Sequence, residues 1–283
     1  MLSPPAGRYL AVCFEASAAP PPILRFAAAG GLLFLLYAFV ESRVKLMTAD
    51  VSAVLYEKFG LRACAGLDGR EGRPALFRSR ALADAGADDA AALRELGIKV
   101  VYDLRKEAER TADPEPFAVR EMFEVRTCPV DLQDDAARTQ ETKARHVKAA
   151  YGRPGERMLF LYGVMADHAD AVRDIAAAIL HEGRPALVHC ANGKDRVGAV
   201  CASVQLACGV SRDAVYADYL LTNECNAAMN RRDLAHYAGL MPPDAVEVLA
   251  AMFEARAEYL DVFVDAIEAR YGSVERWIGK GGA

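Results

Sequence analysis

The sequence lacks the features that mark several common protein classes. It has no excess of positive charge, since 34 Lys and Arg stand against 39 Asp and Glu, and nonspecific nucleic-acid binding depends on cations that neutralise phosphates. We therefore expect no nucleic-acid partner. No Cys-x-x-Cys pair occurs among the seven cysteines, so neither a zinc ribbon nor a disulfide framework is indicated. We expect no bound metal and a reducing, cytoplasmic compartment.

Long hydrophobic runs are also scarce, and the main candidate covers residues 23–40. It is short for a bilayer span, and two adjacent glycines weaken its helix. We interpret it as a membrane anchor, an accessory helix or sequence upstream of the true start. An anchor would make the membrane a partner and would hold the main domain in the cytoplasm, because basic residues follow it. We assign residues 1–73 to this leader and residues 74–283 to a single domain.

The remaining composition is that of a globular protein, with 53% hydrophobic and 26% charged residues. Short apolar segments predict strands over residues 75–78, 98–103, 123–130 and 185–189. Helical periodicity predicts helices over residues 88–96, 157–180, 196–207, 212–223, 244–270 and 273–278. Alternating elements followed by a helical end indicate an α/β fold, with a mostly parallel central sheet flanked by helices.

One segment carries the chemistry, and it lies between a predicted strand and a predicted helix: His-Cys-Ala-Asn-Gly-Lys-Asp-Arg-Val-Gly, residues 189–198. At such a turn backbone N–H groups converge and the helix dipole adds positive potential, which together bind a phosphate dianion. The same field would make the sulfur of Cys190 a nucleophile. Arg196 can clamp two phosphate oxygens with its planar fork. We expect attack of sulfur on phosphorus, then hydrolysis of the phosphocysteine.

The other residues of this loop are expected to bind the substrate. Gly193 permits a tight turn around the anion, and Lys194 would add positive charge suited to substrates with more than one phosphate. The expected substrate-binding residues are Ala191, Asn192, Gly193, Lys194, Val197 and Gly198.

Cys190 could instead be a buried structural cysteine, as free cysteines usually are. Three charged residues follow it closely, and buried cysteines rarely stand beside such a group. The spacing Cys-x₅-Arg alone is weak evidence, because residues 64–70 have it too. That second segment follows no apolar strand and precedes no helix, so we assign the chemistry to Cys190.

At these residues the sequence resembles the cysteine-based protein tyrosine and dual-specificity phosphatases, in particular the bacterial branch with His-Cys-x-x-Gly-Lys-Asp-Arg. The similarity extends to residues 76–79, 101–105, 218–223 and 271–273. It implies a phosphomonoester hydrolase that acts on phosphotyrosine or phosphoserine proteins without metal or organic cofactor. A phosphoinositide phosphatase is the alternative with the same chemistry. A phosphate-binding pseudoenzyme and a sulfur-transfer enzyme are the alternatives from other classes.

Two departures from the family pattern affect these expectations. Val197 stands where the family has Ser or Thr, so the loop lacks a hydroxyl donor and we expect slow breakdown of the phosphoenzyme. The Asn-Phe-Arg-Asp segment that the family carries upstream is missing from residues 47–73. Both departures favour the pseudoenzyme, whereas the retention of Cys190, Asp195 and Arg196 argues against it.

The leaving oxygen needs a general acid. The resemblance implies Asp195, inside the loop, and we favour it over Asp131, Asp134 and Asp135. Those three follow the predicted strand 123–130, where related phosphatases place a mobile acid loop. The polar segment 132–157 is accordingly either an exposed helix and loop or a lid over an anion site.

Overall fold

The computed structural model describes residues 53–130, 152–238 and 243–279. The hydrophobic segment 23–40, the aspartates Asp131, Asp134 and Asp135, and most of the polar segment 132–157 lie outside these ranges. The chain divides into two units, residues 1–55 and 56–283, and the second contains the fold described below. Within the described ranges, no helix has the length and apolar character needed to cross a bilayer.

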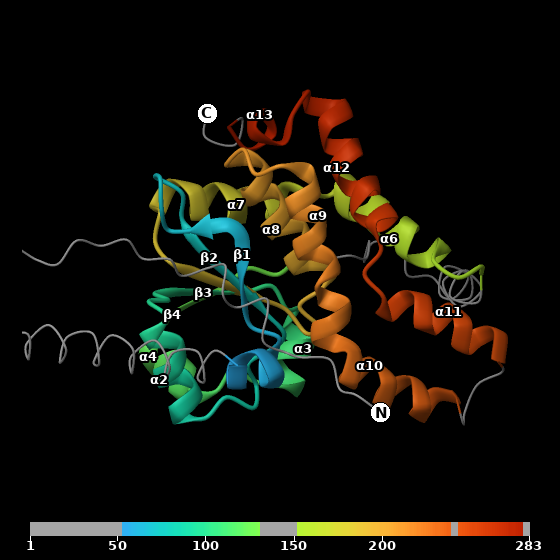
Figure 1. Ribbon diagram of the computed structural model, residues 1–283, viewed down its shortest axis with the longest axis horizontal. Helices are drawn as coiled ribbons and strands as arrows, with labels where there is room; N and C mark the ends of the chain where they lie inside the picture. Colours follow the sequence, from blue (N-terminus) through green and yellow to red (C-terminus); the bar gives the residue numbers. More distant parts are fainter. Residues whose placement is uncertain (1–52, 131–151, 239–242, 280–283) are drawn as a thin grey trace, which may run out of the picture. The chain divides into compact units, whose positions relative to one another are not determined.

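A five-stranded sheet forms the centre of this unit, in the order β1-β2-β5-β3-β4 (Figure 1). Its strands are β1 (Arg62–Asp68), β2 (Ala75–Ser79), β3 (Val100–Asp103), β4 (Glu124–Thr127) and β5 (Ala186–His189). β1 is antiparallel to β2, and all other neighbours are parallel. The middle strand β5 is buried along its whole length. The predicted α/β fold with a mostly parallel sheet is thus confirmed.

Helices cover both faces of the sheet. They are α2 (Ala87–Glu95), α3 (Glu107–Ala112), α4 (Phe117–Met122), α6 (Glu156–Asp167), α7 (Asp170–Glu182), α8 (Asp195–Ala207), α9 (Arg212–Leu220), α10 (Thr222–Ala238), α11 (Pro243–Phe253), α12 (Ala257–Tyr271) and α13 (Val274–Gly279). Because crossovers between parallel strands are right-handed, the connections before β3 and β4 lie on one face and the connection before β5 on the other. Figure 1 accordingly shows α2 and α4 on the opposite side of the strands from α7 and α8.

The sheet begins before residue 74, where we expected the domain to start. β1 pairs with β2 in the register Arg62–Arg78 and Ala63–Phe77. Its sequence, Arg-Ala-Cys-Ala-Gly-Leu-Asp, has no β-branched or aromatic residue, so it lacks the composition that marks a strand. The segment is a strand because it pairs with β2.

The predicted helix 157–180 is wrong, because two helices occupy this stretch. α6 ends at Asp167, and His168 has φ −117° and ψ 42°, outside the helical region. α6 packs against α12, whereas α7 packs against α8. The apolar period runs through both helices, so the sequence does not reveal that they have different packing partners.

The predicted helix 244–270 is also two helices, α11 and α12, separated at residues 254–256. The side chain of Asn223 explains the break. Its amide donates to the carbonyl of Ala255 at 2.8 Å and its oxygen accepts from the N–H of Ala255 at 2.7 Å. These bonds take backbone groups that a continuous helix would need. The predicted helix 212–223 similarly divides at Leu221 into α9 and α10.

Candidate active site

The loop of residues 190–196 joins the end of β5 to the first turn of α8. Ligand sites in parallel sheets lie at the carboxyl ends of the strands, which is where Cys190 emerges. The carbonyl of His189 accepts a hydrogen bond from the N–H of Leu104 at 2.9 Å, and the carbonyl of Ala191 accepts one from Ala81 at 3.2 Å. The two neighbouring strands thus fix the start of the loop from both sides. Cys190 is only 2% exposed.

Gly193 has the tight turn that the sequence predicts. Its φ is +62°, and a Cβ atom at this position would lie 2.5 Å from the carbonyl oxygen of Ser79. No other residue type fits without moving the backbone. The guanidinium of the buried Arg78 donates to the carbonyl of Gly193 at 3.2 Å. This bond fixes the orientation of the peptide group inside the turn.

Arg196 lies in the first turn of α8 and is held by Glu109. Its two terminal nitrogens donate to the two carboxylate oxygens of Glu109 at 2.6 and 2.8 Å. Burial opposes the charge of the guanidinium, but the charges of Cys190 and Glu109 outweigh it and raise the pKa of Arg196. These two parallel hydrogen bonds fix the plane of the guanidinium of Arg196 beside Cys190.

Sequence reasoning missed Glu109. It comes from α3, a helix of six residues with no buried member, and so with no apolar period to find it by. Burial opposes its charge, yet its hydrogen bonds to Arg196 lower the pKa of Glu109. No local signal marks this residue, since its partner is far away in the sequence.

Asp195 is held in place by a tyrosine pair. Its Oδ1 atom accepts a hydrogen bond from the hydroxyl of Tyr162 at 2.9 Å, and Tyr162 shares a bond of 2.8 Å with the hydroxyl of Tyr219. Burial and the charge of Asp195 raise the pKa of Tyr162. The side chain of Asp195 remains 18% exposed. The carboxyl group of Asp195 is thus oriented by Tyr162 and remains partly open to solvent.

Lys194, which we expect to bind the substrate, points instead towards the C-terminal end of α11. Its ammonium donates to the main-chain carbonyls of Met252 and Glu254, the latter at 3.1 Å. It also lies 3.5 Å from Oδ1 of Asp195. Met252 is near the C-terminal end of α11, whose exposed carbonyls attract a cation. The lysine therefore caps α11.

The other expected substrate-binding residues fall into two groups. Ala191 and Asn192 lie on the outer side, and the carbonyl of Asn192 accepts from the amide of Asn226 at 3.0 Å. Val197 and Gly198 are buried in α8, and a Cβ on Gly198 would lie 3.0 Å from the ring of Tyr219. These two residues support the loop from inside the core.

Comparison with known proteins identifies the family of the chain. The model of the tyrosine phosphatase family matches residues 61–283. A "putative tyrosine-protein phosphatase" of Cupriavidus necator is 33% identical over 222 residues, which are 77% of this chain and 77% of that protein. The triple specificity protein phosphatase PtpB of Mycobacterium tuberculosis is 31% identical over 242 residues, covering 75% of this chain and 87% of that one.

The chain therefore belongs to the tyrosine phosphatase family. It is a cysteine-dependent phosphatase that acts on a phosphorylated substrate, and the family implies a cysteinyl-phosphate intermediate. A crystal structure of P. aeruginosa TpbA aligns with 62% of this chain and 86% of its own, at 17% identity and a TM-score of 0.32. A TM-score this low carries no weight for fold or function.

Proposed function

We propose that Cys190 is the nucleophile for phosphotyrosine and that Arg196 and the loop N–H groups bind the transferring phosphoryl group. The observation that carries this proposal is the placement of both residues on one loop, between the buried strand β5 and α8. The sulfur forms a bond to phosphorus as the bond from phosphorus to the tyrosine oxygen breaks. Water then attacks phosphorus, and the sulfur leaves.

We further propose that Asp195 is the general acid. It gives its proton to the leaving tyrosine oxygen in the first step and recovers one from the attacking water in the second. The bond from Tyr162, at 2.9 Å, orients its carboxyl group. Asp131, Asp134 and Asp135 remain the alternatives.

Substitution of Asp195 by asparagine tests this role. The amide keeps an oxygen that can accept from Tyr162 but has no proton to transfer. We expect kcat for phenyl phosphate, which has a poor leaving group, to fall by about 10²- to 10⁴-fold. The fall should be much smaller for 2,4-dinitrophenyl phosphate, whose leaving group needs no proton. An equal loss for both esters would point to another acid, and Asp131→Asn, Asp134→Asn and Asp135→Asn would then be compared in the same assay.

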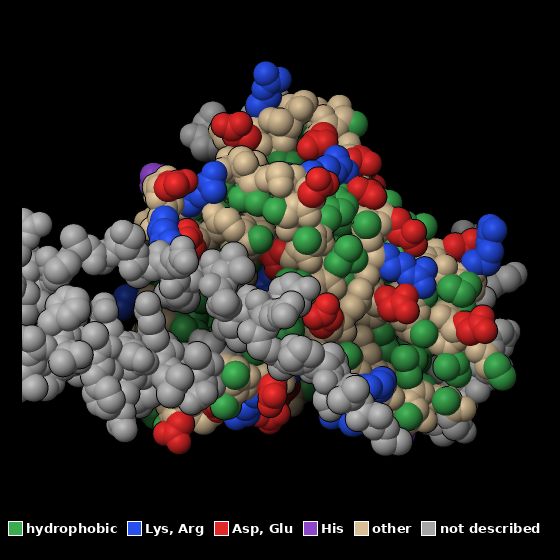
Figure 2. Space-filling model, in the orientation of Figure 1, with side chains coloured by type: hydrophobic (Ala, Val, Ile, Leu, Met, Phe, Trp, Pro, Cys, Tyr) green, Lys and Arg blue, Asp and Glu red, His purple; other side chains and the backbone are tan. Residues whose placement is uncertain are grey.

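The substrate class that fits best is the phosphotyrosine of a protein, rather than a polyphosphorylated phosphoinositide. An ammonium has three donors, and in Lys194 they face Met252, Glu254 and Asp195. The loop thus retains one side-chain cation, Arg196, for one phosphate. On the face seen in Figure 2, acidic and basic side chains of the described residues are interspersed.

A substrate panel checks this assignment. We expect kcat/KM for phosphotyrosine peptides to exceed that for phosphatidylinositol trisphosphate by about tenfold or more, since a lost charged contact corresponds to 1.5–3 kcal/mol. One relative is named a triple specificity phosphatase, so phosphoserine and phosphothreonine peptides belong in the panel. The Cys190→Ser variant supplies the blank. Faster hydrolysis of the lipid would favour the phosphoinositide alternative, and no hydrolysis of any ester would favour the pseudoenzyme.

We also propose that the catalytic domain starts near residue 61, because β1 is part of its sheet. The six cysteines in the described part of the chain are free thiols, which supports a reducing, cytoplasmic setting. We expect slow breakdown of the phosphoenzyme because of Val197, and this stays a prediction. A membrane anchor at residues 23–40 also stays a prediction.

A further inference from the structure

A closed cluster of polar side chains lies directly behind the nucleophile loop. It consists of His189, Asp103, Arg105 and Glu115, which are 0%, 1%, 1% and 8% exposed. His189 immediately precedes Cys190, and its ring lies between two carboxyl groups. Its Nδ1 atom is 3.9 Å from Asp103 Oδ1, and its Nε2 atom is 3.5 Å from Glu115 Oε2.

Three atoms of this cluster have no hydrogen-bond partner among the residues that the structure describes. They are both ring nitrogens of His189 and the Oε1 atom of Glu115. Buried polar atoms nearly always have a partner, and each exception calls for a physical reason. For Nε2 of His189, a proton on the facing Oε2 atom of Glu115 would supply one.

Arg105 supplies the positive charge of the cluster, and Asp103 already balances it. Its guanidinium donates to both oxygens of Asp103 at 2.9 Å and to Oε2 of Glu115 at 2.6 Å. The guanidinium thus bridges the two carboxyl groups. Burial opposes the charge of Asp103, but its bonds to Arg105 lower the pKa of Asp103. Glu115 thus shares Arg105 with Asp103, and it forms no ion pair with another lysine or arginine in the described part of the chain.

The other charges near Glu115 do not change this balance. Asp113, at the end of α3, and Asp103 disfavour its anion, whereas Arg105 and Arg120 of α4 favour it. Burial is the largest effect and raises the pKa of Glu115 to about 7.

Burial also lowers the pKa of His189 to about 4, assisted by Arg105 and Arg196 and opposed by Asp103 and the main chain of Cys190. Two buried groups of this kind are more stable as a neutral pair than as an ion pair, because charges in a low dielectric lose their hydration. The single proton of the pair therefore belongs on the carboxyl group.

We propose that Glu115 is a positioning residue that works as a neutral carboxylic acid, donating a hydrogen bond to Nε2 of His189 and so holding the backbone that carries Cys190. The inference rests on the proposed role of Cys190. With Nε2 accepting, the ring proton is on Nδ1 and faces the Asp103 carboxylate. Ionisation of Glu115 would remove the donor and place a negative charge behind a loop that must bind a phosphate dianion.

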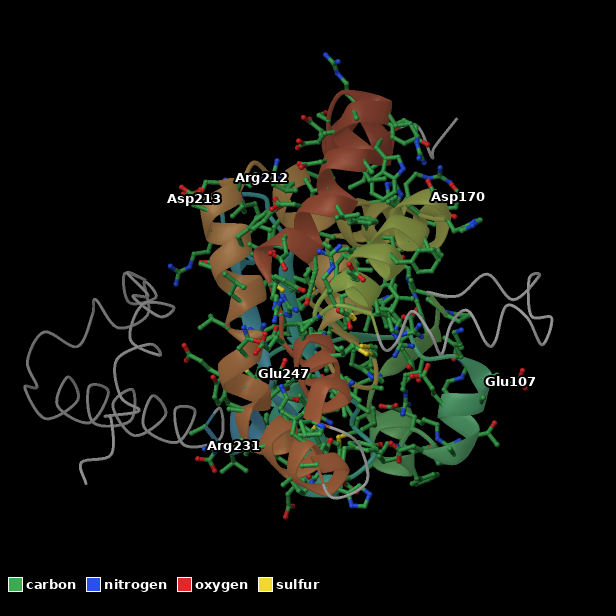
Figure 3. All side chains as sticks on the ribbon, turned by 90° about the vertical axis from the view of Figure 1, so that its right-hand side faces the viewer. Glu107, Asp170, Arg212, Asp213, Arg231 and Glu247 are labelled. Carbon is green, nitrogen blue, oxygen red and sulfur yellow. The ribbon has the colours of Figure 1, made fainter. Side chains whose placement is uncertain are left out.

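The test is the pH profile of kcat/KM between pH 5.5 and 8.5 for the wild type and Glu115→Gln. Glutamine can donate to His189 and accept from Arg105 without ionising. The wild type should lose activity above pH 7, by about tenfold per pH unit, because the protonated fraction of Glu115 falls by that factor. The variant should lack this loss, exceed the wild type by about thirtyfold at pH 8.5, and match it within about threefold at pH 5.5. Glu107→Gln is the matched control, because Glu107 is exposed on α3 and points away from the fold (Figure 3).

Two outcomes of the activity measurements overturn the proposal. One is a Glu115→Gln variant that keeps the alkaline loss of the wild type. The other is a folded variant that is inactive across the whole pH range. Infrared spectroscopy of the wild type needs no variant: the C=O band of a buried carboxylic acid should be present at pH 6 and absent at pH 8.5, and its absence at pH 6 also overturns the proposal.

A parallel assay of Cys190→Ser separates this inference from the proposed function. If the serine variant stays active, the assignment of the nucleophile fails. If the serine variant is inactive and Glu115→Gln copies the wild-type profile, only the role of Glu115 fails.

Discussion

Substitution of Cys190 by serine is expected to lower the turnover of p-nitrophenyl phosphate by about 10⁴-fold or more, as loss of a covalent nucleophile does in other enzymes. A serine hydroxyl stays protonated at neutral pH and is a poor nucleophile. The loop N–H groups, Arg196 and the bond from Arg78 to Gly193 remain in place. The variant should therefore bind a phosphotyrosine peptide with a Kd within a few-fold of the wild-type KM, as measured by calorimetry.

Cys208→Ser is the matched control for this prediction. Cys208 is a half-buried free thiol at the opposite end of α8 from the loop. We expect its turnover to stay within about twofold of the wild type, because substitutions away from a site change little. If Cys190→Ser retains turnover while a different cysteine variant loses it, the nucleophile is elsewhere.

Substitution of Arg196 by lysine should lower kcat/KM by about 10³-fold, as removal of a preorganised transition-state donor does. Lysine keeps the positive charge, but its compact ammonium lacks the planar arrangement of donors of a guanidinium. It cannot engage both oxygens of Glu109, which now accept at 2.6 and 2.8 Å, nor two oxygens of a phosphoryl group. Most of the loss should fall on kcat, because the clamp is strongest when charge redistributes in the transition state.

Arg212→Lys controls for the general effect of this exchange. Arg212 begins α9 on the outside of the fold (Figure 3), where it pairs with Asp261 and Asp265. Its substitution should leave kcat/KM within about twofold, since exposed ion pairs contribute little. An Arg196→Lys variant within tenfold of the wild type would show that the guanidinium does not clamp the phosphoryl group.

The sequence alone is sufficient to predict those parts of the fold that have a local cause. The buried strand β5 is a continuous apolar segment, and α8 begins at the charged end of the loop. β1 and α3 have neither an apolar period nor a strand-like composition, and they form only through contacts with distant segments. The break before α7 arises from different packing partners, and the break before α12 arises from the hydrogen bonds of Asn223. A continuous apolar period reveals neither.

The candidate site divides in the same way. Cys190, Asp195 and Arg196 lie within seven consecutive residues, so their proximity is a property of the sequence. Glu109 and Tyr162 reach the loop only because α3 and α6 pack beside it. For Lys194 the sequence predicts a charge but not its direction, and the carbonyls at the end of α11 determine that.

The buried pair behind the nucleophile has a consequence for protein stability. Folding raises the pKa of Glu115 from 4.5 to about 7, so this group alone makes the free energy of unfolding fall as pH rises through that range. Folding lowers the pKa of His189 from 6.5 to about 4, so this group alone makes that free energy rise with pH. The two slopes offset each other between about pH 4.5 and 6.5, where folding moves one proton from the imidazole to the carboxyl group with almost no net exchange with solvent. The free energy of unfolding, measured against pH in this range, would therefore show almost no slope from this cluster.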